Sequence, residues 1–170
     1  MDTTGGLAGF SESQRAGLDV RQADRDRTLA AMHRLEEMLG SAAPGREQQW
    51  SSEVLGALVA LNQATAEEAD NAELPDSLLS DLARTQPWLR NRVRAIRLQY
   101  RQLRETLASL RHELEEEGGP SVDHADVRRR LASVLTELRH QRARESDLIY
   151  EAYYEAFHAD LPAEAADPPR

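Results

Sequence analysis

Five charged or phenolic side chains of this sequence occupy places where a helical pattern calls for apolar ones. They are Arg25, Glu68, Tyr100, Arg142 and Glu145. Each falls on or beside a stripe of apolar residues that recur at steps of three and four, which is the spacing of one face of an α-helix. Because a charged group is costly to bury unless it is paired and hydrogen-bonded, the pattern predicts a polar network inside a helical fold.

Two kinds of chemistry fit these residue types. An Arg–Glu–Tyr network would fix the register of the helices, because a guanidinium binds a carboxylate through two parallel hydrogen bonds. The alternative is a carboxylate-rich metal site of the kind that helix bundles build in their cores. Its ligand set would be Glu68, Tyr100, Glu145, His33 and His140. Arg142 favours the structural network, because a fixed cation inside a site repels a metal ion.

Motifs of other chemistries are absent from the sequence. Cysteine does not occur, which excludes disulfides, thiolate metal sites and cysteine nucleophiles. There is no phosphate-binding loop, no dinucleotide fingerprint and no zinc-spaced pair of ligands. Nothing in the sequence places a serine beside a histidine for acyl transfer. Enzymatic activity is left open, but the sequence favours a protein without activity or cofactor, with iron or another divalent metal as the alternative.

The charge of the chain limits its partners. Its 170 residues carry a net charge of −9 at pH 7, which argues against nonspecific binding to DNA or to anionic membranes. No run is apolar for long enough to span a membrane, and none has the pattern of a signal peptide. We therefore expect a cytoplasmic protein that binds no nucleic acid and no membrane.

The clearest element that must position these side chains runs from Trp88 to Glu115. Its apolar stripe consists of Leu89, Val93, Ile96, Tyr100, Leu103, Leu107, Leu110 and Leu114. These residues follow a heptad spacing, which predicts a long helix with one apolar face. Such a helix needs other helices to cover that face.

Three other helical segments are available to cover it. They span residues 11–39, 47–72 and 125–157, and a short helix capped by Asp76 or Ser77 precedes the long one. Stretches rich in Gly and Pro separate the segments. The sequence thus predicts an all-α, up-down-up-down four-helix bundle over residues 11–157. Residues 1–10 are expected to be a flexible N-terminus, and residues 158–170 a disordered tail.

Two surfaces could contact a partner. The long helix is rich in arginine, at Arg90, Arg92, Arg94, Arg97, Arg101, Arg104 and Arg111. We expect a solvated face paired with acidic residues of neighbouring helices, with a phosphate-binding stripe as the alternative. The end of the last helix is aromatic, and its interface candidates are Tyr150, Tyr154 and Phe157. They fit a protein partner or a homodimer, unless the N-terminal segment covers them through Phe10 and Leu18.

Several short segments of the sequence resemble segments of a known protein family. They are Pro44-Gly45-Arg46-Glu47, Pro75-Asp76-Ser77-Leu78-Leu79 and Asp147-Leu148-Ile149-Tyr150-Glu151-Ala152-Tyr153. Over about residues 25–157 the chain resembles uncharacterised bacterial helical proteins related to the hemerythrin-like family. The resemblance implies an up-down four-helix bundle. It also implies two irons held by a His on the first helix, His-x3-Glu on the second, His-x3-His on the third and His-x4-Asp on the fourth.

Most of these imidazoles are missing from this chain. His33 could stand for the first ligand, and His140 with Glu145 preserves the spacing of the fourth helix. The second helix has no His, and the third has no His-x3-His. At about 100° per residue, His140 points away from the apolar stripe of its own helix. We therefore expect a hemerythrin-like bundle that has lost its diiron site and acts through protein–protein contacts.

Overall fold

The computed structural model describes residues 11–41, 44–116 and 123–159, and the side chains of the last helix as far as Tyr153. Within these ranges the secondary structure is helical and includes no strand. The elements are α1 (Glu12–Gly40), α2 (Glu47–Glu73), α3 (Leu78–Thr85), the 3-10 helix η2 (Pro87–Leu89), α4 (Arg90–Glu116) and α5 (His124–Ala159). Of the expected termini, residues 1–10 and 160–170 lie outside the described residues. The expected tail began at residue 158, but residues 158 and 159 are the last residues of α5.

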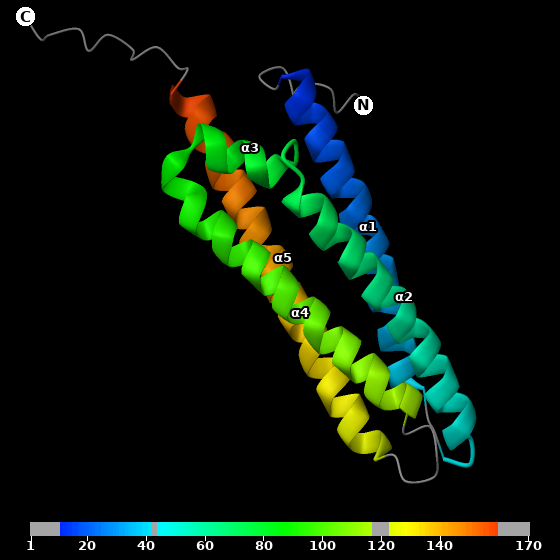
Figure 1. The fold of residues 1–170 in the computed structure, drawn as a ribbon. Coiled ribbons are helices and arrows are strands. Elements are labelled where there is room, and N and C mark those ends of the chain that lie inside the picture. The colour runs from blue at the N-terminus through cyan, green and yellow to red at the C-terminus, as the bar shows by residue number, and fades with distance from the viewer. Residues whose placement is uncertain (1–10, 42–43, 117–122, 160–170) are drawn as a thin grey trace, which may run out of the picture.

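The four long helices form an up-down-up-down bundle (Figure 1). α1 packs along α2, α2 along α4, and α4 along α5, while α1 and α5 approach each other least of the neighbouring pairs. α3 lies at the end of the bundle where α1 begins and α5 ends. The prediction of an all-α four-helix bundle is confirmed.

Local sequence signals account for several helix ends. The Ser11 hydroxyl accepts a hydrogen bond from the Gln14 backbone N–H at 3.2 Å, and the Gln14 side chain accepts one from the Ser11 N–H, which forms a capping box. Ser77 caps α3 in the same way, by accepting from the Ser80 N–H. Asp123 accepts from the first N–H groups of α5. Pro87, Trp88 and Leu89 form a 3-10 turn, so α4 begins at Arg90 and not at Trp88 as the sequence predicted.

The buried apolar residues form two clusters. The larger one joins the C-terminal half of α1 to α2, α4 and α5, and consists of Met32, Leu35, Leu39, Trp50, Val54, Ala57, Leu58, Leu61, Leu107, Leu110, Leu114, Val127, Leu131, Val134, Leu135 and Leu138. The smaller one lies toward α3 and consists of Ala69, Ala72, Leu79, Leu82, Leu89, Val93, Ile96, Tyr100, Leu148 and Ala152. Polar residues from four helices lie between the two clusters.

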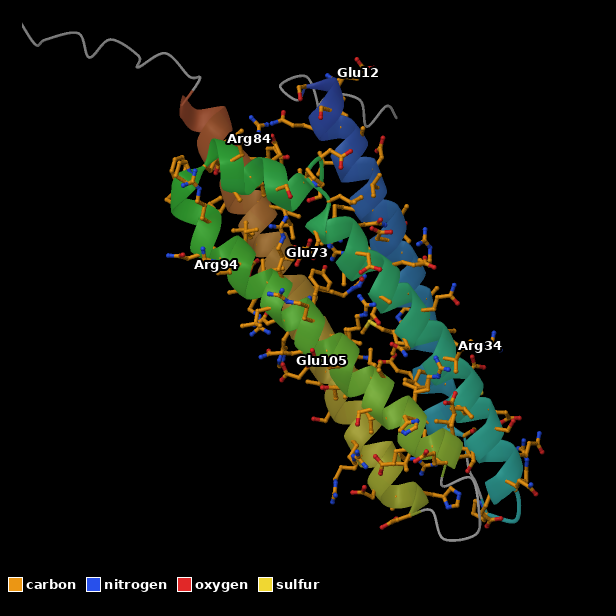
Figure 2. All side chains as sticks on the ribbon, viewed as in Figure 1. Glu12, Arg34, Glu73, Arg84, Arg94 and Glu105 are labelled. Atoms are coloured by element: carbon orange, nitrogen blue, oxygen red, sulfur yellow. The ribbon has the colours of Figure 1, made fainter. Side chains whose placement is uncertain are left out.

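The outside of the bundle is densely charged (Figure 2). Three arginines of α4 pair with acidic residues of neighbouring helices: Arg92 with Glu151, Arg97 with Glu73, and Arg104 with Asp70. These pairs agree with the expected solvated and paired face. Arg94 and Arg101 have no hydrogen-bond or ion-pair partner in the described part of the chain. No helix in the described ranges is both long and apolar enough to cross a membrane.

Candidate functional site

The side chain of Arg21 lies among two carboxylates and a phenol in the middle of the bundle. Its Nη2 donates to the Tyr100 hydroxyl at 2.6 Å and forms an ion pair with Glu145. The same nitrogen lies 3.3 Å from Oε1 of Glu68. The side chains of Arg21, Glu68 and Glu145 are 9%, 3% and 6% exposed. Residues from α1, α2, α4 and α5 therefore meet in one buried network.

The phenol of Tyr100 links the two carboxylates. Its hydroxyl donates to Oε2 of Glu145 at 2.5 Å and lies 3.1 Å from Oε1 of Glu68. The other oxygen of Glu68 accepts from the Thr28 hydroxyl at 2.7 Å. Each carboxylate oxygen of Glu68 and Glu145 thus has a donor from this chain, as buried charged groups require.

Electrostatics keep the network in a defined protonation state. Burial lowers the pKa of Arg21, but electrostatic interactions with Glu145, Tyr100 and Glu68 outweigh this effect and raise the pKa above its ordinary value. Burial raises the pKa of Tyr100 well above its ordinary value, and the neighbouring charges of Glu145 and Glu68 raise it further. At neutral pH, Arg21 is therefore a cation and Tyr100 a neutral donor.

The structure brings Glu68, Tyr100 and Glu145 together, but Arg25 requires a correction. The side chain of Arg25 is exposed, and its Nη1 donates to Oγ of Ser146 at 2.8 Å. The buried cation is Arg21, one helical turn earlier. The spacing of the apolar stripe, continued backward from Met32 through polar residues, allows Arg21 as well as Arg25 on the buried face. The buried residues of α1 are Leu39, Leu35, Met32, Thr28, Asp24 and Arg21.

Arg142 stands at the edge of this network. Its side chain is 11% exposed, and Nη2 lies 3.7 Å from Oε1 of Glu68. The same nitrogen donates to the backbone carbonyl of Arg25 at 2.7 Å, which ties α5 to α1. Arg142 therefore adds a second positive charge beside Glu68.

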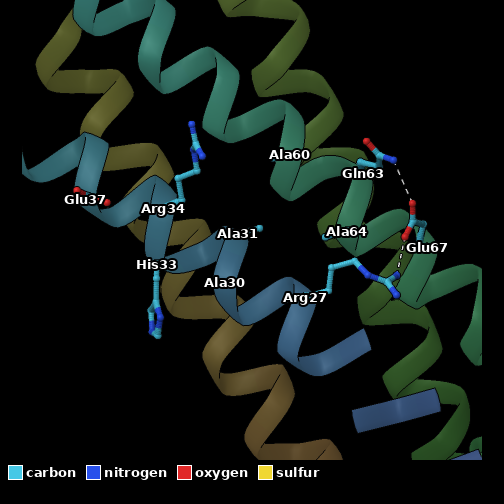
Figure 3. Close-up of a pocket in the computed structure, with 10 residues that line it drawn as sticks. All are labelled: Arg27, Ala30, Ala31, His33, Arg34, Glu37, Ala60, Gln63, Ala64 and Glu67. Carbon is cyan, nitrogen blue, oxygen red and sulfur yellow. Dashed lines mark hydrogen bonds and ion pairs between the residues drawn. The ribbon is translucent and has the colours of Figure 1, made fainter. Parts of the chain in front are cut away.

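Of the alternative metal ligands, His33 and His140 are not brought to Glu68, Tyr100 and Glu145. His33 and His140 are exposed, and Figure 3 shows His33 on α1 pointing away from α2. No group of three His, Cys, Asp or Glu side chains in the described ranges is placed to hold a metal ion. Glu68 and Glu145 instead share Arg21, whose charge opposes a metal ion. The residues present do not fit the diiron centre of the hemerythrin-like family.

The aromatic end of α5 is described only in part. Tyr150 is 69% exposed. Tyr153 packs against the smaller apolar cluster, and burial, with a smaller contribution from Asp81, raises the pKa of its phenol to about 12. The side chains of Tyr154 and Phe157 lie outside the described ones, and so does Phe10, so the alternative in which the N-terminal segment covers them stays untested.

Two hollows lie beside α1. One is a wide groove of about 790 Å³ between α1 and α2, whose lining includes four alanines, Arg27 and Glu67 (Figure 3). Nη1 of Arg27 donates to Oε2 of Glu67 at 2.6 Å. The other is a cavity of about 310 Å³ between α1 and α5, and Arg21, Glu68 and Glu145 line its inner wall. The buried network therefore forms one side of a cavity.

Comparison of the chain with protein-family models, with curated proteins and with solved structures finds no match. The resemblance to hemerythrin-like bundles stays a prediction from the sequence.

Proposed function

We propose that this chain is a non-enzymatic, hemerythrin-like helical bundle that has lost its diiron site and acts through contacts with another protein. The observation that carries this proposal is the position of Arg21 among the buried carboxylates. With a donor on every oxygen of Glu68 and Glu145, the centre of the bundle stabilises the fold and offers those carboxylates no free position for a metal. The protein would then act through its surface, by binding another protein.

The proposed contact surface is the aromatic end of α5. Tyr150 is exposed there, and Tyr154 and Phe157 follow it at helical spacing. Tyrosine is enriched at protein interfaces, because it combines a large apolar ring with a hydrogen-bonding group. The partner to test first is a second copy of the chain, since a two-fold dimer would place the same aromatic residues on both sides of the contact.

The test is the mass of the protein in solution, measured by sedimentation equilibrium over a range of concentrations. We expect the wild-type chain to be a dimer and the Tyr150→Ser, Tyr154→Ser double variant to be a monomer. The matched control is Trp88→Ser, which removes an aromatic side chain of similar exposure, 61%, from η2 and should leave the dimer intact. A wild-type chain that is monomeric at every concentration would rule out the homodimer.

A further inference from the structure

Two residues that line the cavity between α1 and α5 carry a buried donor without an acceptor. Nη1 of Arg21 and Nε of Arg142 are both buried and have no hydrogen-bond partner in the described part of the chain. Both side chains line the cavity, and they are only 9% and 11% exposed. A buried N–H group without a partner is costly, so these two nitrogens indicate an acceptor that the chain itself does not supply.

The charges of the cavity indicate the kind of acceptor. Three arginines line it, Arg21, Arg25 and Arg142, and so do two acidic residues, Glu68 and Glu145. The carboxylate oxygens already have donors, whereas the unpartnered atoms are N–H groups. The lining therefore has one excess positive charge and two N–H groups without an acceptor. Such a lining favours a singly charged anion over a cation or a neutral donor.

The cavity also has apolar lining. Leu18 of α1 and Ile149 and Tyr150 of α5 contribute to it. A volume of about 310 Å³ lies at the lower end of the range for small-molecule sites, and an apolar lining with a few placed polar groups is typical of them.

We propose that this cavity binds a small monocarboxylate, whose carboxylate accepts hydrogen bonds from Arg21 and Arg142 and whose apolar body lies against Leu18 and Ile149. The site shares Tyr150 with the proposed protein contact but does not depend on that contact, and the test leaves Tyr150 unchanged.

The test is isothermal titration of the full chain with benzoate and with hexanoate, and with the neutral analogues benzamide and hexanamide. We expect saturable binding of at least one carboxylate at one site per chain, at least tenfold tighter than its amide. Arg142→Gln should weaken that binding by tenfold or more, because it removes the cation and the Nε–H. Arg94→Gln is the matched control and should have no effect, because Arg94 lies on the exposed face of α4.

A second variant keeps the test decisive if Arg142→Gln does not fold. Ser146 lines the cavity and is partly exposed, so Ser146→Phe should fill the space, keep the helical circular dichroism signal and abolish binding. The proposal is overturned if neither carboxylate binds the folded wild-type chain, or if the amides bind equally well. It is also overturned if folded Arg142→Gln and Ser146→Phe variants bind as tightly as the wild type.

Discussion

The protonation state of Tyr100 is set by the residues around its hydroxyl. Its phenol is buried between Glu68 and Glu145, so ionisation would add a third negative charge at a place shielded from water. The hydroxyl therefore stays a hydrogen-bond donor over a wide range of pH. The sequence alone could not predict that the Tyr100 hydroxyl stays protonated, because its pKa depends on Glu68 and Glu145, which lie on two other helices.

The raised pKa of Tyr100 predicts a loss of stability at high pH. Above about pH 10 the unfolded chain releases the phenolic proton while the folded chain keeps it, so the free energy of unfolding falls by up to about 1.4 kcal/mol per pH unit. Below that pH the contribution is fully present. Urea unfolding at about pH 8, pH 10 and pH 11 measures the effect.

Two variants separate Tyr100 from other groups in this measurement. Tyr100→Phe should be less stable at pH 8 by about 1–3 kcal/mol, because buried acceptors lose a donor. It should also lose stability less steeply above pH 10. Tyr150→Phe changes an exposed tyrosine and should keep the wild-type slope. Equal slopes in all three proteins would show that Tyr100 titrates alike in the folded and unfolded chains.

At the scale of the element, α1 depends on polar contacts along its N-terminal half. Its buried residues there are Arg21, Asp24 and Thr28, whereas Met32, Leu35 and Leu39 belong to the apolar core. Asp24 accepts from the Asn71 side chain at 3.1 Å, and Thr28 donates to Glu68. The network therefore attaches this half of the helix to α2, α4 and α5.

Replacing Arg21 should detach this part of α1. Arg21→Met leaves the charges of Glu68 and Glu145 buried without their main cation, so we expect a loss of about 3–5 kcal/mol in the free energy of unfolding. Arg25→Met is the matched control, because Arg25 is exposed on the same helix, and its effect should stay within about 0.5 kcal/mol. If the two variants lost stability equally, the assignment of Arg21 as the buried cation would be wrong.

The sequence predicted the elements well because their signals are local. Heptad spacing, Gly and Pro breaks, and capping residues such as Ser11 and Ser77 each act within a few residues. The buried face of α1 was harder to predict, because polar residues take the place of apolar ones along the first half of the helix. A rule that counts apolar residues stops at Met32, and the choice between Arg21 and Arg25 then depends on contacts with other helices.

At the scale of the whole molecule, a polar layer separates two apolar clusters. The sequence predicted that layer, since Glu68, Tyr100 and Glu145 interrupt the stripes of three helices. It did not predict the cavity, because the space between α1 and α5 depends on how closely these two helices approach. The sequence indicated that His140 points away from the core, but it left His33 open as a ligand, and the exposure of His33 depends on how the helices pack.

We propose that Arg21, which pairs with the buried carboxylates of Glu68 and Glu145, keeps metal ions out of the centre of the bundle. The measurement that tests it most directly is metal content by elemental analysis, on protein purified without chelator and then reloaded with iron, manganese or zinc. We predict far less than one metal ion per chain after every loading. Near-stoichiometric metal that is lost in Glu68→Ala or Glu145→Ala would contradict the claim and identify the centre as a metal site.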